Sequence, residues 1–179
     1  MKFDEVLQSR RSIRRYTGEP VSDAQIQACL EAATLAPSWK NSQTARFYVI
    51  QNPVLRAQLD QEAMADFNVN NTRNAPVLVV MTFRKGQSGW GNDGNPANEG
   101  ANGWGWLDLG LALENFCLQA EDLGLGTLIM GIRDEAALRR LLQIPENEQV
   151  GPVVSLGHPD IDPAMPARLP VNKRTVYFR

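Results

Sequence analysis

Four arginines and a serine stand close together near the start of the chain, in the stretch SRRSIRRYTG. The guanidinium groups of Arg10, Arg11, Arg14 and Arg15 each offer a planar fork of N–H donors, and Ser12 adds a hydroxyl. Such donors, clustered without a carboxylate, favour the binding of a phosphate group. A solvated basic helix end has the same composition, so this stretch alone leaves both interpretations open.

A second group of hydrogen-bonding side chains follows in the stretch APSWKNSQTARF. Pro37 ends a predicted helix, because the residue before a proline avoids helical geometry. The polar residues after it are suited to a planar ligand that forms hydrogen bonds, and they are equally consistent with an ordinary polar loop. They are Ser38, Asn41, Ser42 and Gln43.

The glycines of LGLGTLIMG do not form a nucleotide-binding loop. A dinucleotide fingerprint needs G-x-G-x-x-G between a strand and a helix, but Ile129 takes the place of the third glycine and the glycines follow a helix. Neither GxxxxGK[ST] nor GxSxG occurs, and His158, the only histidine, does not support a zinc site or a serine-hydrolase triad. An enzyme with this sequence would therefore take its reactivity from a cofactor.

Length and composition indicate one globular domain. The chain has 179 residues, of which 43% are hydrophobic and 21% charged, with a net charge of -2 that argues against a general nucleic-acid binder. No run of 18 apolar residues suggests a membrane span, and the first residues do not read as a secretory signal. The two cysteines, Cys29 and Cys117, fall in apolar helical patterns, so we expect free thiols and a cytoplasmic protein.

Periodicity and capping residues predict the elements that position these groups. Ser22 with Gln25 forms a capping box, Asn52 with Pro53 opens another helix, and Asp134 caps a third. Helices are predicted near 3–7, 23–36, 53–63, 106–123 and 135–142, and strands near 47–50, 76–82, 127–130, 150–157 and 175–178. This alternation favours an α/β sandwich with a buried parallel sheet.

The order of the motifs resembles the nitroreductase family of flavoproteins. RRSIRRY near the start, APSWKNSQ, LGLGTLIMG after a long apolar helix and RLP near the end follow one another at the spacings of that family. The resemblance covers nearly the whole chain and implies a single domain over residues 1–179, as in the compact members. It also implies an α+β fold, a nitroreductase-like sandwich with a mostly antiparallel central sheet flanked by helices, in place of the parallel sheet.

The resemblance further implies an FMN site and assigns residues to it. The arginine stretch would hold the phosphate and part of the ring system, through Arg10, Arg11, Ser12 and Arg14. The P-S-x-x-N-x-Q segment would border the flavin or reach it from the partner subunit, through Pro37, Ser38, Trp39, Asn41 and Gln43. Met130 and Gly131 match the strand end that approaches flavin N5, and Arg168 matches a tail arginine at the phosphate, with Arg174 as the substitute. Asn70 and Arg73 resemble an N-x-x-[KR] pair near the pyrimidine.

The activity implied is that of an FMN-dependent oxidoreductase. It would take hydride from NAD(P)H and reduce nitroaromatic, quinone or similar acceptors by a ping-pong mechanism, as a homodimer with FMN at the interface. The flavin carries the chemistry, so no catalytic side chain, metal, nucleic acid or membrane is expected. The alternatives are a nitroreductase-fold enzyme with another redox substrate, a flavin-binding or redox-sensing protein with little turnover, and an interaction module that uses its basic arm.

Three departures from the family pattern concern the substrate and not the cofactor. Trp39 and Lys40 stand where small residues are common, and Thr44 stands where proline is usual. A Gly- and Trp-rich stretch at about 84–105 lies where substrate-covering segments vary, and we expect it to cover the substrate.

Overall fold

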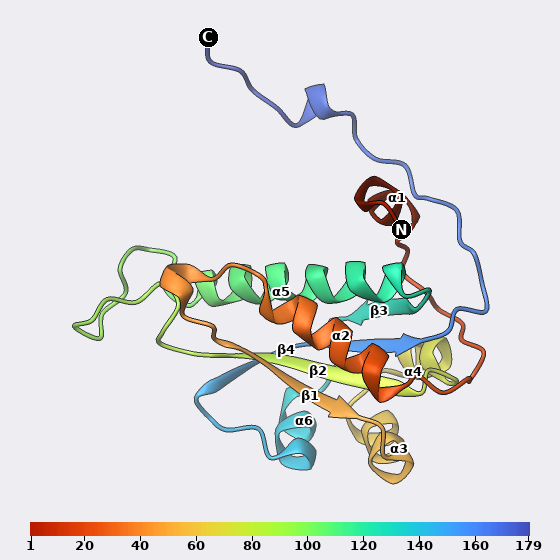
Figure 1. Cartoon of the computed structure of the whole chain (residues 1–179). Coiled ribbons are helices and arrows are strands. Elements are labelled where there is room, and N and C mark those ends of the chain that lie inside the picture. Colours follow the sequence, from red (N-terminus) through yellow and green to blue (C-terminus); the bar gives the residue numbers. More distant parts are fainter.

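The computed structural model describes residues 1–179 and divides them into six α-helices and four strands (Figure 1). The helices are α1 (Phe3–Ser9), α2 (Asp23–Thr34), α3 (Pro53–Glu62), α4 (Asp66–Thr72), α5 (Gly103–Asp122) and α6 (Glu135–Leu142). The strands are β1 (Ala45–Ile50), β2 (Val77–Arg84), β3 (Gly126–Met130) and β4 (Glu148–Gly157), and two short 3-10 turns are η1 (Trp39–Asn41) and η2 (Val171–Lys173).

The four strands form one antiparallel sheet in the order β1-β2-β4-β3. The antiparallel sheet implied by the family resemblance is confirmed, and the parallel sheet favoured by the alternation of elements is wrong. The reason is the place of β4. Because β2 and β3 each pair with β4 in antiparallel fashion, they run in the same direction, as a strand–helix–strand unit requires, but β4 lies between them.

Helices cover both faces of the sheet and make it a three-layer sandwich (Figure 1). Strand β2 is buried on both sides, which explains its continuous apolar sequence. Its alternate residues point to opposite faces: Val79 and Met81 pack in the cluster that includes α2 and α5, whereas Leu78 and Val80 pack in the cluster that includes α3 and α6.

The predicted helix starts are confirmed by their caps. The hydroxyl of Ser22 accepts the N–H of Gln25, and the side chain of Gln25 accepts the N–H of Ser22 in return. The Asn52 side chain accepts two backbone N–H groups at the start of α3, and Asp134 accepts the N–H of Ala137 at the start of α6. These caps act over a few residues, which is why the sequence alone was enough to predict them.

Two expectations about the elements are wrong. The pattern gave no helix at 66–72, where α4 forms without a side-chain cap at its first turn. The strand expected at 175–178 does not form either, because the tail after Pro163 has no neighbouring strand to pair with. The tail leaves the body of the molecule (Figure 1). Its apolar side chains are exposed, up to 95% for Phe178.

None of the helices combines the length and the apolar character that crossing a membrane requires.

Candidate functional site

The segment of residues 10–16 precedes α2, and we call it the N-terminal arm. It is fixed against the outer edge of β3. The N–H of Ile13 donates to the carbonyl of Thr127 at 2.8 Å, and the Tyr16 hydroxyl contacts Ser155 Oγ at 2.7 Å. Burial raises the pKa of Tyr16, so the hydroxyl stays protonated and donates to the carbonyl of Ile13. Gly126 allows the close approach, since a Cβ there would lie 2.5 Å from Ile13.

The arm brings the arginine stretch and the tail to one cavity of about 200 Å³. Arg10, Arg11, Ser12 and Arg14 line it from the arm, and Arg168 lines it from the tail, about 155 positions later in the chain. Pro163, Ala164 and Pro166 complete the wall. The structure therefore gathers five of the predicted cofactor residues around a single space, which we call the arginine cavity.

The arginine cavity is rich in donors that lack a partner anion. The Nε atom of Arg11 is buried and has no hydrogen-bond partner, although the other end of this guanidinium donates to the carbonyl of Arg10 at 2.9 Å. The one carboxylate that pairs with these arginines is Glu114, at 3.7 Å from Arg10 Nε. A buried N–H without an acceptor is costly, so the donor set fits an anionic group such as a phosphate.

The other two arginines considered for this role lie elsewhere. Arg15 forms an ion pair with Asp160 at 2.9 Å and also donates to the carbonyl of that residue. Arg174 follows η2 in the exposed tail and does not line the arginine cavity. Of the two tail arginines proposed for the phosphate, Arg168 and Arg174, Arg168 is thus the one that the structure brings to the arm.

Strand β3 leads from the arm to the other predicted residues of this side. Met130, the last residue of the strand, is buried, whereas Gly131 is exposed, and no backbone carbonyl accepts its N–H. Asn68 of α4 donates to the carbonyl of Ile132 at 3.2 Å, so α4 lies beside this strand end. Asn70 and Arg73 are hydrogen-bonded to each other on the same helix end.

The segment from Ser38 to Gln43 has an unusual backbone. Lys40, Asn41 and Gln43 adopt φ values of +46°, +56° and +48°, a region that residues other than glycine rarely occupy. The N–H of Gln43 donates to Ser38 Oγ at 3.0 Å and closes the segment into a tight loop. The N–H of Trp39 donates to both carboxylate oxygens of Asp108 on α5 at 3.1 Å.

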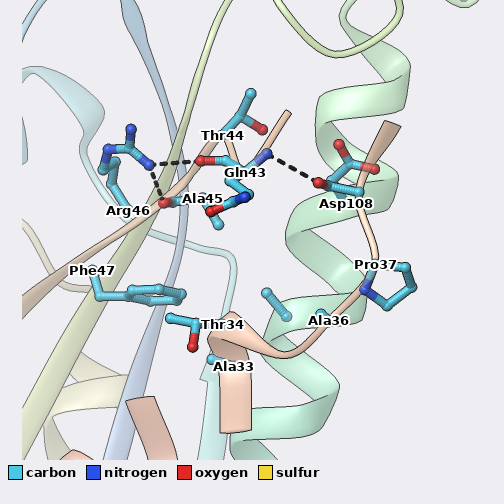
Figure 2. Close-up of a pocket in the computed structure, with 12 residues that line it drawn as sticks. Ala33, Thr34, Ala36, Pro37, Gln43, Thr44, Ala45, Arg46, Phe47 and Asp108 are labelled. Atoms are coloured by element: carbon cyan, nitrogen blue, oxygen red, sulfur yellow. Dashed lines mark hydrogen bonds between the residues drawn. The ribbon is translucent and has the colours of Figure 1, made fainter. Parts of the chain in front are cut away.

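Behind this segment lies a second cavity of about 140 Å³ (Figure 2). Pro37, Ser38 and Gln43 line it, but Trp39 and Asn41 do not. Its other polar groups include Thr44, whose hydroxyl is buried without a partner, and Arg46, which donates to the carbonyls of Gln43 and Ala45.

The predicted site has two halves, the arginine cavity with the arm and the segment Ser38–Gln43. They lie at opposite corners of the sheet. The arm pairs with Thr127, which is opposite Leu156 of β4, whereas Ala45 at the start of β1 is in register with Gln149 of β4, through Phe83. Seven residues separate these two positions of β4, about 23 Å along the strands, and three strand spacings separate β1 from β3, about 14 Å. The arginine cavity and the segment Ser38–Gln43 therefore lie far apart within one chain.

The Gly- and Trp-rich stretch, which runs from the end of β2 into the first turn of α5, packs onto the segment Ser38–Gln43. The rings of Trp39 and Trp104 lie 4.7 Å apart with an interplanar angle of 51°. Trp90 and Trp104 donate their indole N–H groups to Asn102 and Asn98. Gly100 has to be a glycine here, because a Cβ would lie 2.6 Å from the Trp104 ring.

The sequence reasoning missed Asp108 and Arg46, and it singled out Thr44 only as a departure from the family pattern. Asp108 had a signal, since it is a single acid in the apolar run WLDLGLAL and is 5% exposed in the structure. A carboxylate at a buried helix position needs donors from elsewhere in the fold. Thr44 and Arg46 had no such signal.

Comparisons with known proteins show what the chain as a whole is similar to. The family model described as "Nitroreductase family" matches residues 7–73 and 60–158. A protein of Archaeoglobus fulgidus, whose name joins NADH dehydrogenase and NAD(P)H nitroreductase, is 36% identical over 159 residues, covering 86% of this chain and 83% of its own. The FMN reductase [NAD(P)H] of Bacillus subtilis is 31% identical, with coverages of 98% and 76%.

Among solved structures, a Desulfovibrio desulfuricans protein in complex with FMN superposes with a TM-score of 0.79. The two sequences are 26% identical, and the match covers 100% of this chain and 98% of that one.

Proposed function

Because the chain belongs to the nitroreductase family, we propose that it is an NAD(P)H-dependent oxidoreductase with FMN as its cofactor. The observation that carries the cofactor assignment is the arginine cavity with its unpaired Arg11 Nε. Relatives named for NAD(P)H and FMN, and a similar protein solved with FMN, support it.

In this proposal the arginine cavity binds the phosphate. Arg10, Arg11, Arg14 and Arg168 neutralise its charge, and Ser12 adds a hydroxyl donor. The tail is then part of the binding site, since it contributes Arg168.

The end of β3 serves the ring system. The free N–H of Gly131 is a donor for a ring nitrogen, and the absence of a side chain there leaves room for a flat group. When bound, FMN supplies the chemistry by accepting hydride from NAD(P)H and passing two electrons to the acceptor. The side chains bind and orient, and none has to act as a nucleophile or base.

We infer that the working form is a homodimer with FMN at the interface. The distance between the two corners of the sheet supports this, because the segment Ser38–Gln43 then meets the flavin held by the partner subunit. The outer face of α5 also supports it: Trp106, Leu107 and Leu111 are 46%, 50% and 38% exposed, whereas Leu109 and Phe116 of the same helix are buried. An apolar surface of this kind favours association.

For the acceptor we propose a nitroaromatic, quinone or similar flat molecule, covered by the Gly- and Trp-rich stretch. Nicotinamide and acceptor would use the same space in turn, which gives ping-pong kinetics. The proposal includes a cytoplasmic location, where reduced pyridine nucleotides are available. The alternatives are another redox substrate on the same fold, or a flavin-binding or redox-sensing protein with little turnover.

An absorption spectrum tests the central proposal. The purified protein, supplied with FMN and desalted, should retain flavin bands that bleach when NADH or NADPH is added without oxygen. A protein that retains no FMN would refute the proposal. Bleaching without turnover on menadione or a nitroaromatic would favour the sensor alternative.

Steady-state kinetics test the mechanism. With NADH and menadione varied together, double-reciprocal plots should be parallel. Intersecting lines would indicate a ternary complex and contradict the ping-pong proposal.

A further inference from the structure

The segment Ser38–Gln43 needs an external support, because its backbone conformation is unfavourable. Lys40, Asn41 and Gln43 are all left-handed, and none of them is glycine. This conformation costs free energy in residues with a Cβ, and they keep it only when surrounding contacts determine it. The hydrogen bond from Gln43 N to Ser38 Oγ lies within the segment, so it does not fix the segment to the rest of the molecule.

Asp108 provides the fixed point. Its two carboxylate oxygens accept the N–H of Trp39 at 3.1 Å each, and Oδ2 also accepts the hydroxyl of Ser42 at 3.4 Å. These donors lie on both sides of the left-handed residues Lys40 and Asn41. Asp108 itself belongs to α5, a helix of 20 residues that packs in the core, so the contact ties the segment to the core of the fold.

The burial of Asp108 lowers the free energy of unfolding, so stability does not explain why a carboxylate stands at this position. Its side chain is 5% exposed and no lysine, arginine or histidine pairs with it. An apolar side chain at this helix position would avoid the cost of removing a carboxylate from water. The contacts that Asp108 does make all go to one segment, and this segment carries the P-S-x-x-N-x-Q residues.

An aromatic contact joins the segment to the same helix, α5. Trp39 packs against Trp104 in the first turn of α5, one helical turn before Asp108, with ring centroids 4.7 Å apart. A shift of the Trp39 backbone would therefore change the Trp39–Trp104 geometry. This pair is a built-in reporter of the segment's position.

We propose that Asp108 is a positioning residue that holds Ser38–Gln43 in the conformation in which this segment meets the FMN of the partner subunit. The proposal rests on the proposed function for the identity of the ligand. The position of the segment itself depends only on contacts within one chain.

The test uses the full-length protein and substitutions at both ends of the contact. Asp108→Asn keeps the shape but removes the charge and leaves one acceptor oxygen in place of two, Asp108→Ala removes both acceptors, and Ser42→Ala removes one donor. Asp122→Asn is the matched control, because this carboxylate is on the same helix and pairs with the amino terminus at the surface. The measurements are the FMN dissociation constant, kcat and KM with NADH and menadione, the melting temperature, and the tryptophan exciton signal in far-UV circular dichroism.

We expect Asp108→Asn to weaken FMN binding by about threefold to tenfold, the range for one lost hydrogen-bonding contact. Its kcat should fall by about tenfold or more because the bound ring is misplaced. The tryptophan exciton signal should change as well. Ser42→Ala should change the same quantities in the same direction by less, and Asp122→Asn should change none of them.

Two results would overturn the proposal. One is a folded Asp108→Asn protein with the wild-type exciton signal; the other is wild-type FMN affinity and kcat together with an altered signal. If Asp108→Ala does not fold, Asp108→Asn and Ser42→Ala still decide the question. If the proposed function is wrong, the wild-type protein binds no FMN. The exciton signal of the variants then still reports whether Asp108 holds the segment.

Discussion

Arg11 is the arginine of the arm that has a buried N–H donor without an acceptor, which favours the binding of a ligand. Its guanidinium is held by the carbonyl of Arg10, while its buried Nε has no acceptor. Arg15, four residues later, has the same side chain but pairs with Asp160. Two arginines of one short stretch thus have different tasks, and substitutions can tell them apart.

We predict that Arg11→Ala weakens FMN binding by about tenfold to a hundredfold. A charge-assisted hydrogen bond to a buried anion contributes about 1.5–3 kcal/mol, which corresponds to that range. Fluorescence titration of the apoprotein with FMN measures the effect, and a melting curve checks that the variant is folded. Arg15→Ala is the matched control and should bind FMN as the wild type does; equal affinities for the two variants would assign Arg11 a purely structural role.

The two cysteines give a prediction about pH. Burial raises the pKa of Cys29 to about 12 and that of Cys117 to about 11, from an ordinary value of 9.0. Below pH 9 both thiols are protonated in the folded and the unfolded chain, so their contribution to stability is fully present. Above pH 9 the unfolded chain releases these protons first, and the contribution is lost as the pH rises towards 11–12.

The free energy of unfolding should therefore decrease between pH 9 and pH 11, as measured by urea titration. The slope should be smaller in the Cys29→Ala/Cys117→Ala protein. At pH 8 neither thiol of the native protein should react with iodoacetamide at the rate of a free thiol. Rapid labelling of the native chain would contradict the burial of these groups.

At the scale of elements, α5 contains two glycines with different surroundings. A Cβ on Gly105 would lie 2.3 Å from the ring of Phe83 on β2, so the helix reaches the sheet only because this residue has no side chain. Gly110 lies five residues further along the same helix, and a Cβ there would meet nothing within 4 Å.

We predict opposite effects for the same substitution at these two positions. Gly105→Ala should destabilise the protein by about 1–3 kcal/mol because it overpacks the contact with Phe83. Gly110→Ala should stabilise it by about 0.5–1 kcal/mol, because alanine is the better helix former and has room. Urea denaturation measures both, and equal effects would mean that α5 is not packed on the sheet at Gly105.

At the scale of the whole molecule, the tail connects the site with assembly. It contributes Arg168 to the arginine cavity, and beyond this residue its apolar side chains are exposed. Beyond Arg168 the hydrogen bonds of the tail stay within the tail, as in η2. The outer face of α5 is exposed as well, at Leu107 and Leu111.

We predict that a chain ending at Pro163 loses both the dimer and FMN, whereas the full-length protein is a dimer of about 40 kDa, twice the chain mass of 19.9 kDa. Size-exclusion chromatography with light scattering measures the mass. Full-length Arg168→Ala separates the two roles of the tail, because it should remain a dimer while binding FMN more weakly. A full-length monomer that retains FMN would reject the shared site, and a shortened dimer that retains FMN would reject the role of the tail.

The sequence by itself determined the local elements and the family. Caps such as Ser22 with Gln25, and the continuous apolar run of β2, act between residues that are neighbours in the chain, so their signals can be read without a fold. The motif order implied the antiparallel sandwich. It also picked out the arginine stretch and the Ser38–Gln43 segment, although it left open how each of them meets the flavin.

Only the tertiary structure decided which distant groups meet. It inserted β4 between β2 and β3, brought Arg168 rather than Arg174 to the arm, and placed the buried Asp108 under Trp39. It also put the two halves of the predicted site at opposite corners of the sheet. Such contacts result from packing elements against one another, and packing depends on shape, volume and chain closure across the whole molecule, which no local pattern contains.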